Sequence, residues 1–151
     1  MNAMKQKDRT IQILLVEDNP MDVLMIRECL KKWRIKNYVH VAQDGEQALD
    51  FLFGRGGFVG SPRPDLMLLD LNLPKTSGDE VLSEIKKNPD FSGITVVVVT
   101  TFDAVADRQV WNDLGAQLCI TKPLDFDEYY RAISYVEEFW IATHESLRDC
   151  K

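Results

Sequence analysis

The sequence predicts an α/β fold: a doubly wound parallel sheet of five strands with five helices. Short apolar runs alternate five times with segments of helical periodicity, and strands that alternate with helices form parallel sheets covered on both faces. Two of the runs, Leu66–Leu69 and Ile94–Val99, are continuously apolar, as expected for strands buried on both sides. A length of 151 residues suits one domain with a full core.

The first half of the chain contains two strand–helix units. Ile11–Val16 is rich in β-branched residues, which favours a strand, and it stops at a loop before Pro20, a residue type common at helix starts. Apolar residues then recur at helical spacing over 23–33. The same order repeats with a strand at 37–42 and a helix over 44–53.

The second half of the chain begins with a loop and then contains three more strand–helix units. The glycine- and proline-rich segment 54–64 has the composition of a loop. Gly115 is typical of a helix end. We expect strands at 66–69, 94–99 and 117–121, and helices at about 78–88, 104–114 and 126–143.

Composition and charge exclude several classes of function. The chain has 18 Lys and Arg against 24 Asp and Glu, a net charge of −6, so it lacks a chain-wide basic footprint for nucleic acid. It has no run of the roughly 20 apolar residues that a membrane span needs, and its polar first residues lead us to expect no secretory leader. Its three cysteines form no CxxC pair and are expected to be reduced thiols in a cytoplasmic protein.

The expected organisation is a single domain over residues 10–143. A polar segment, 1–9, precedes it and is expected to be mobile, and a short tail, 144–151, follows it. The sequence shows no internal repeat and no interdomain linker, and we expect no separate output domain, because little sequence follows the last helix. Any function is therefore expected to reside in this one sheet and its loops.

Charged and hydroxyl side chains follow four of the five expected strands. Glu17 and Asp18 follow the first strand, Asp70 the third, Thr100 the fourth and Lys122 the fifth. In open parallel sheets, ligands bind outside the carboxyl ends of the strands, near the point where the strand order reverses. We therefore expect these side chains to converge at one edge of the sheet.

Three acids gathered at one edge predict a divalent cation. Two carboxylates about 4 Å apart repel by about 4 kcal/mol at an effective dielectric of about 20. Oxygen donors without His or thiolate ligands favour Mg²⁺, which in proteins usually also contacts phosphate oxygens. A lysine and a threonine beside such a cation suit phosphoryl chemistry, in which positioning and charge neutralisation provide most of the catalysis.

Four motifs at these positions resemble the receiver domain of bacterial response regulators. The resemblance covers residues 11 to about 140, and the motifs occur in the family's order at compatible spacing: Leu14–Asn19, Leu68–Pro74 with Gly78, Val98–Thr101 and Ile120–Pro123. The resemblance implies the flavodoxin-like strand order 2-1-3-4-5. Three further segments are similar to single-domain regulators encoded with phytochrome-type histidine kinases: 63–66, 71–75 and Phe139–Trp140.

The resemblance implies a phosphoacceptor and a set of metal ligands. Asp70 matches the family's phosphoacceptor, which attacks a phosphohistidine on a partner histidine kinase. Asp18 and Asp70 match direct Mg²⁺ ligands, and Glu17 matches an acid that acts mainly through a coordinated water. Asn72 matches the residue whose backbone carbonyl binds the metal.

The resemblance also implies how the phosphoryl group is recognised. Thr100 would hydrogen-bond it and reorient on phosphorylation, Lys122 would pair with one of its oxygens, and the Lys122–Pro123 peptide would be cis. The sequence departs from the family at Cys119, where a rotating Tyr or Phe usually stands, which puts the usual switch in question. Phe102 is also unusual beside the site, and we hypothesise that its ring limits water access.

Other functions have specific requirements that the sequence does not meet as well. Each site residue alone would more often be an ordinary loop or surface residue, so the interpretation rests on the whole set. An aspartyl-phosphate phosphatase needs a second carboxylate two residues after its nucleophile, where this chain has Asn72. A pseudo-receiver that binds partners without phosphorylation remains an alternative. The expected activity is limited to the chain's own phosphorylation and dephosphorylation, not turnover of a metabolite.

The last helix carries more apolar residues than one sheet face can cover. One stripe is expected to be core: Phe126, Tyr129, Tyr130, Ile133, Val136 and Trp140. A second stripe suggests a partner surface: Tyr135, Phe139 and Ala142. The family resemblance implies homodimerisation through the helix near 104–114 with Trp111, the strand at 117–121 and the last helix. The alternative is a set of scattered exposed aromatic residues.

Overall fold

The protein forms a five-stranded parallel sheet with helices on both faces, seen in a computed structural model that describes residues 10–73, 75–100 and 112–149. The strand order β2-β1-β3-β4-β5 confirms the expected order. The strands are β1 (Ile11–Val16), β2 (Asn37–Ala42), β3 (Leu66–Asp70), β4 (Thr95–Thr100) and β5 (Leu118–Thr121). The described helices are α2 (Pro20–Lys31), α3 (Gly45–Phe53), α4 (Gly78–Lys87) and α6 (Phe126–Asp149), with short 3₁₀ turns η1 (Gly56–Phe58) and η2 (Pro89–Phe91).

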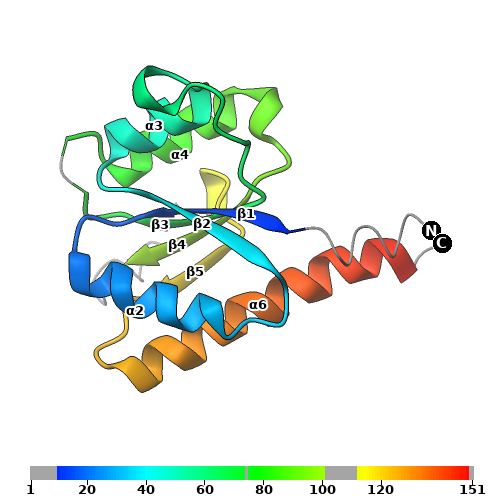
Figure 1. Ribbon diagram of the computed structural model, residues 1–151. Coiled ribbons are helices and arrows are strands. Elements are labelled where there is room, and N and C mark those ends of the chain that lie inside the picture. Colours follow the sequence, from blue (N-terminus) through cyan, green and yellow to red (C-terminus); the bar gives the residue numbers. More distant parts are fainter. Residues whose placement is uncertain (1–9, 74, 101–111, 150–151) are drawn as a thin grey trace.

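Two hydrophobic clusters hold the three layers together, with α3 and α4 on one face of the sheet and α2 and α6 on the other (Figure 1). Neighbouring residues of a strand point to opposite faces, so Met67 joins the α3–α4 cluster while Leu68 joins the α2–α6 cluster. All residues of β3 and β4 are buried. The apolar character of these two strands therefore reflects burial on both faces.

The helix starts that border the site follow from capping side chains. The Asn19 side chain accepts hydrogen bonds from the N–H groups of Met21 and Asp22 at the start of α2, and Pro20 occupies the first helical position. Asp44 caps α3 in the same way through the N–H of Gln47. The Asn19 cap therefore starts α2 directly after the Glu17–Asp18 pair.

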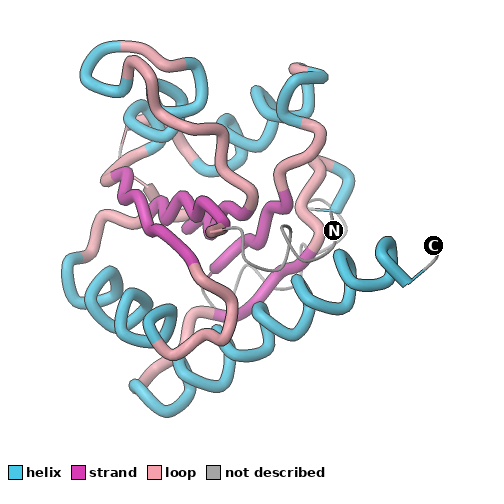
Figure 2. Tube along the Cα trace, turned by 45° about the vertical axis from the view of Figure 1, so that its right-hand side comes forward, coloured by secondary structure: helices cyan, strands magenta, loops and turns pink. Residues whose placement is uncertain are grey.

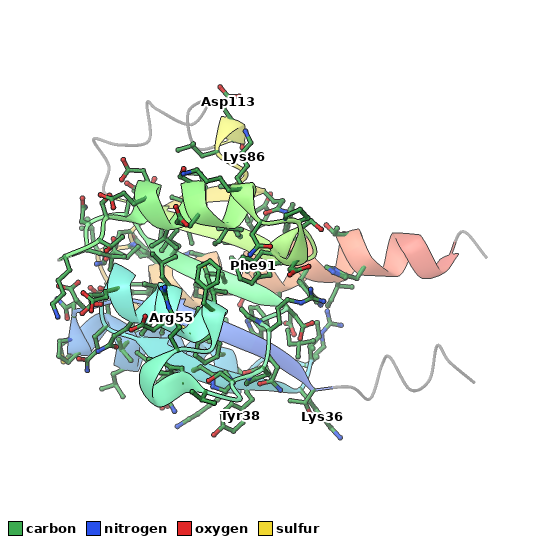
Figure 3. All side chains as sticks on the ribbon, turned by 90° about the horizontal axis from the view of Figure 1, so that it is seen from above. Lys36, Tyr38, Arg55, Lys86, Phe91 and Asp113 are labelled. Carbon is green, nitrogen blue, oxygen red and sulfur yellow. The ribbon has the colours of Figure 1, made fainter. Side chains whose placement is uncertain are left out.

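Long-range contacts secure the face that carries α3 and α4. The centres of the Phe91 and Phe53 rings lie 5.3 Å apart, and the Arg55 guanidinium carbon lies 5.0 Å from the centre of the Phe53 ring (Figure 3). The Lys86 ammonium donates a hydrogen bond to the backbone carbonyl of Asp113 (Figure 3). The end of α3 is therefore joined to η2, and the end of α4 is joined to the segment before β5.

The last helix is longer than the sequence indicated, since α6 continues beyond residue 143 to Asp149 and includes most of the expected tail (Figure 2). No glycine or proline interrupts residues 126–149, and the His144 ring stacks on the Trp140 ring with 3.5 Å between centroids. Contacts one turn apart of this kind extend a helix. The expected helix near 104–114 lies largely outside the described residues, as do Phe102, Trp111 and residues 1–9.

Two further expectations are wrong. No peptide bond within the described ranges is cis, so the Lys122–Pro123 bond is trans, the isomer that X–Pro bonds favour by about 0.5–1 kcal/mol. Phe126 and Tyr130 are exposed rather than core, and the Lys32 ammonium lies 5.8 and 5.2 Å from the centres of their rings. Within the same ranges, the helices include none that is both long and apolar enough to cross a bilayer.

Candidate functional site

The carboxyl ends of the strands bring three acids together. Glu17 and Asp18 follow β1, and Asp70 is the last residue of β3. Each of these residues offers a carboxylate oxygen, and these oxygens all lie within 4.8 Å of one another. Because β1 and β3 are hydrogen-bonded neighbours in the centre of the sheet, the strand pairing itself brings the acids together.

Backbone N–H groups orient two of these carboxylates. The N–H of Asn72 donates to Asp70 Oδ1 at 2.9 Å, and the N–H of Asn19 donates to Glu17 Oε2 at 3.1 Å. Glu17 and Asp70 are only 1% and 3% exposed, whereas Asp18 is exposed to solvent. Two buried, fixed carboxylates and one solvated carboxylate therefore form the cluster.

Lys122 crosses the edge of the sheet to reach the buried acids. Its ammonium nitrogen lies 3.1 Å from Asp70 Oδ2 and 3.3 Å from Glu17 Oε1. The backbone N–H of Lys122 donates to the carbonyl of Thr100, which holds the start of the loop after β5 against the end of β4. The lysine is therefore fixed at both its backbone and its ammonium.

The electrostatics of the site favour an added cation. Burial and the nearby Asp70 carboxylate raise the pKa of Glu17 to about 7. Burial alone would lower the pKa of Lys122, but the hydrogen bond to Asp22 and the charges of Asp70 and Glu17 outweigh it and raise that pKa. One ammonium does not offset the acid cluster, and its all-oxygen donor set fits a hard divalent ion such as Mg²⁺.

Thr100 has an unpartnered hydroxyl at this edge. Thr100 ends β4 and is fully buried, and its Oγ1 finds no hydrogen-bond partner among the residues that the structure describes. β4 pairs with β3 so that Asp70 lies opposite Val99, the residue before Thr100. A buried hydroxyl beside the acid cluster is therefore available to a ligand.

Asn72 and Cys119 lie outside the acid cluster. Asn72 is exposed, and its N–H binds Asp70, so the role of its carbonyl as a metal ligand stays a prediction. Cys119 is partly buried, lies opposite Val98 in the β4–β5 pair and packs against the α3–α4 cluster. It occupies the place of the family's switch aromatic as a small apolar residue, in line with the sequence.

The sequence does not predict two residues of the site, Asp22 and Tyr129. Asp22 Oδ2 lies 2.9 Å from the Lys122 ammonium, and the Tyr129 hydroxyl donates to Asp22 Oδ1 at 2.5 Å. Burial and the hydrogen bond to Asp22 raise the pKa of Tyr129 above its ordinary range. The available signal was the position of Asp22, an acid in the first turn of the helix that directly follows the Glu17–Asp18 pair.

Comparison with known proteins places these features in a family. The model of the response regulator receiver domain matches residues 13–134. The response regulator Rcp1 of Synechocystis sp. is 41% identical over 131 residues, which cover 87% of this chain and 89% of Rcp1.

Solved structures give the same result. A crystal structure of the Mn²⁺-bound form of response regulator Rcp1 superposes with a TM-score of 0.80 at 41% identity, covering 86% of this chain and 94% of that one. A crystal structure of the phosphorylated cyanobacterial phytochrome response regulator RcpA gives a TM-score of 0.82 at 38% identity, covering 89% of this chain and 96% of that one. The chain therefore belongs to the response regulator receiver domain family of two-component systems.

Proposed function

We propose that this chain accepts a phosphoryl group on Asp70 from a sensor histidine kinase, in a Mg²⁺-dependent reaction, and signals through a surface that this group alters. One observation carries the proposal: the buried Asp70 carboxylate contacts the Lys122 ammonium at 3.1 Å and, together with Glu17 and Asp18, forms an acid cluster suited to a divalent ion. The phosphorylated state of the relative RcpA supports it.

In the proposed reaction, an oxygen of Asp70 attacks the phosphorus of a phosphohistidine. A phosphorus–oxygen bond forms, the phosphorus–nitrogen bond breaks, and the imidazole nitrogen keeps the electron pair of the broken bond. The Asn72 N–H holds the attacking carboxylate by its Oδ1. The Lys122 ammonium and the Thr100 hydroxyl would stabilise the charge on the phosphoryl oxygens, which is the main source of catalysis in such transfers.

The proposed metal ligands are the acids of the cluster. The carboxylates of Asp18 and Asp70 would bind Mg²⁺ directly, Glu17 would act mainly through a coordinated water, and Asn72 would add its backbone carbonyl. When bound, Mg²⁺ supplies positive charge between these acids and the phosphoryl oxygens. The Mn²⁺-bound form of the relative Rcp1 supports a divalent ion at a site of this kind.

The relatives also suggest the partners. We propose a phytochrome-type histidine kinase as the phosphoryl donor, because RcpA is described as a phytochrome response regulator. A downstream protein in the cytoplasm would read the phosphorylated surface. We further propose a homodimer through the expected helix near 104–114, β5 and α6, where the Tyr135 side chain is 53% exposed. The chemistry is limited to the chain's own phosphorylation and dephosphorylation.

The phosphorylation proposal is tested by incubating the protein with acetyl phosphate and Mg²⁺ and measuring its intact mass. The wild type should gain the mass of one phosphoryl group, and Asp70→Asn should gain none. Omitting Mg²⁺ should suppress the gain. Equal labelling of both proteins would contradict the role of Asp70, and no labelling of the wild type by any phosphodonor would favour a phosphorylation-independent binding module.

The identity of the donor is tested by phosphotransfer kinetics. The protein is mixed with a phosphorylated phytochrome-type kinase and, separately, with a phosphorylated histidine kinase of another sensor class. We expect faster loss of label from the first kinase. Equal rates, or a faster reaction with the second kinase, would contradict the phytochrome association while leaving Asp70 as the acceptor.

A further inference from the structure

We infer that Asp22, held in place by Tyr129, is a positioning residue that anchors the Lys122 ammonium at the phosphorylation site. The inference rests on the proposed function, because Asp22 and Tyr129 would affect the same phosphoryl transfer through Lys122, without touching the reacting atoms. Neither side chain belongs to the acid cluster of Glu17, Asp18 and Asp70.

The contacts form a continuous chain from α6 through α2 and the loop after β5 to the end of β3. The Tyr129 hydroxyl of α6 donates to Asp22 Oδ1 of α2 at 2.5 Å, and the other oxygen of that carboxylate lies 2.9 Å from the Lys122 ammonium nitrogen. The same nitrogen then reaches Asp70 Oδ2, at the end of β3, at 3.1 Å. Asp22 is therefore the carboxylate nearest to the ammonium.

The Asp22 carboxylate is held rigidly because Tyr129, which donates a hydrogen bond to it, is buried. Tyr129 is 1% exposed and packs in the α2–α6 cluster, so its hydroxyl is fixed by the core. Asp22 lies in the first turn of α2, next to the Asn19 cap. A carboxylate held by one hydrogen bond from α6 and by its own helix loses little freedom on binding the lysine, whereas a free lysine side chain has many rotamers.

The anchor matters when a phosphoryl group arrives. An ammonium has three N–H groups, and Asp22, Asp70 and Glu17 each lie within hydrogen-bond or ion-pair distance of it. A phosphoryl oxygen would replace the contact with Asp70. The contact with Asp22 then holds the ammonium beside the start of α2, so that it is already in place to receive the phosphoryl oxygen.

The test compares two conservative variants, Tyr129→Phe and Asp22→Asn, with Tyr130→Phe as the matched control. Tyr130 is the next residue of the same helix, is exposed and packs on Lys32 outside the site. We expect the initial rate of labelling by acetyl phosphate to fall about fivefold in Tyr129→Phe, a value within the range for residues in one hydrogen-bond network. Tyr130→Phe should label at the wild-type rate.

Two further measurements separate positioning from general damage. The Mg²⁺ affinity of Tyr129→Phe should stay within about twofold of wild type, since no charge is removed. The double variant should label no more slowly than Asp22→Asn alone, because the hydroxyl acts through that carboxylate. Full additivity of the two rate losses, or wild-type labelling of Tyr129→Phe, would overturn the inference.

An NMR measurement keeps the inference independent of phosphorylation. We expect the Lys122 side chain to be more mobile in Tyr129→Phe than in wild type, as seen in the relaxation of its ε-methylene and ammonium groups. If the wild type accepted no phosphoryl group, the proposed function would fail, but this measurement would still show whether Tyr129 and Asp22 hold the Lys122 side chain in place. Identical Lys122 relaxation in both proteins would contradict it.

Discussion

The Lys122 ammonium nitrogen lies 3.1 Å from Asp70 Oδ2 and so joins the loop after β5 to the end of β3. This contact occupies an oxygen of the proposed nucleophile, which is also one of the three acids of the metal cluster. Lys122 therefore has opposing effects in the metal-free protein: it offsets the repulsion between buried acids, and it competes with a cation for them.

Removing the lysine charge should weaken the fold and strengthen metal binding. Lys122→Met leaves Glu17 and Asp70 buried without their cation, and breaking a pair of this kind costs about 3 kcal/mol when fully buried and less where water reaches the lysine, as here. We expect a lower denaturant midpoint without Mg²⁺ and a tighter Mg²⁺ dissociation constant by calorimetry. Weaker Mg²⁺ binding in this variant would contradict the competition.

Magnesium should stabilise the folded protein because it relieves repulsion among the acids. At a concentration about 100 times its dissociation constant, a ligand that binds only the folded state adds about 2.7 kcal/mol to the free energy of unfolding. We expect a higher melting temperature in MgCl₂ than in NaCl of equal ionic strength. Asp18→Asn should lose most of this difference, and an equal gain in both salts would mean that the cluster binds no specific ion.

Thr100→Val should separate stability from function. The substitution keeps the shape of the side chain and removes a buried hydroxyl that has no partner among the described residues, which should raise the free energy of unfolding by about 1 kcal/mol. The same variant should be labelled more slowly by acetyl phosphate, because it lacks the donor for the phosphoryl group. Thr95→Val, at the other end of β4, is the control and should leave labelling unchanged.

Gly78→Ala should displace the segment that carries the phosphoacceptor. A Cβ at Gly78 would lie 2.8 Å from Leu71 Cα and 3.1 Å from the Asp70 carbonyl oxygen, whereas a Cβ at Gly93 would meet nothing within 4 Å. We expect Gly78→Ala to cost about 1–3 kcal/mol of unfolding free energy, as overpacking does, and to slow labelling of Asp70. Chemical denaturation of Gly93→Ala should show no comparable loss, and equal behaviour of the two variants would contradict the close approach.

Most of the fold and the acid cluster could be predicted from the sequence because their signals are local. Apolar runs such as Leu66–Leu69 mark buried strands, and the rule that ligands bind at the carboxyl ends of parallel strands brings Asp70 near Glu17 and Asp18 without further information. The helix start at Pro20 likewise follows from the Asn19 cap.

The remaining features depend on tertiary contacts that no local pattern records. The Tyr129–Asp22 hydrogen bond joins two helices that are distant in sequence, and a tyrosine in an apolar stripe reads simply as core. Phe126 and Tyr130 share that stripe but lie against Lys32. The end of α6 was misplaced because residues 144–149 are polar but contain neither glycine nor proline to stop the helix.

The central claim is most directly tested by locating the phosphoryl group in the chain. The protein is labelled with acetyl phosphate and Mg²⁺, reduced with borohydride, which converts an aspartyl phosphate to homoserine, and sequenced by tandem mass spectrometry. If Asp70 is the phosphoacceptor, homoserine should form at position 70 alone, and none should form when Mg²⁺ is withheld. Homoserine at position 18, or an unmodified Asp70 in protein that has gained phosphoryl mass, would contradict it.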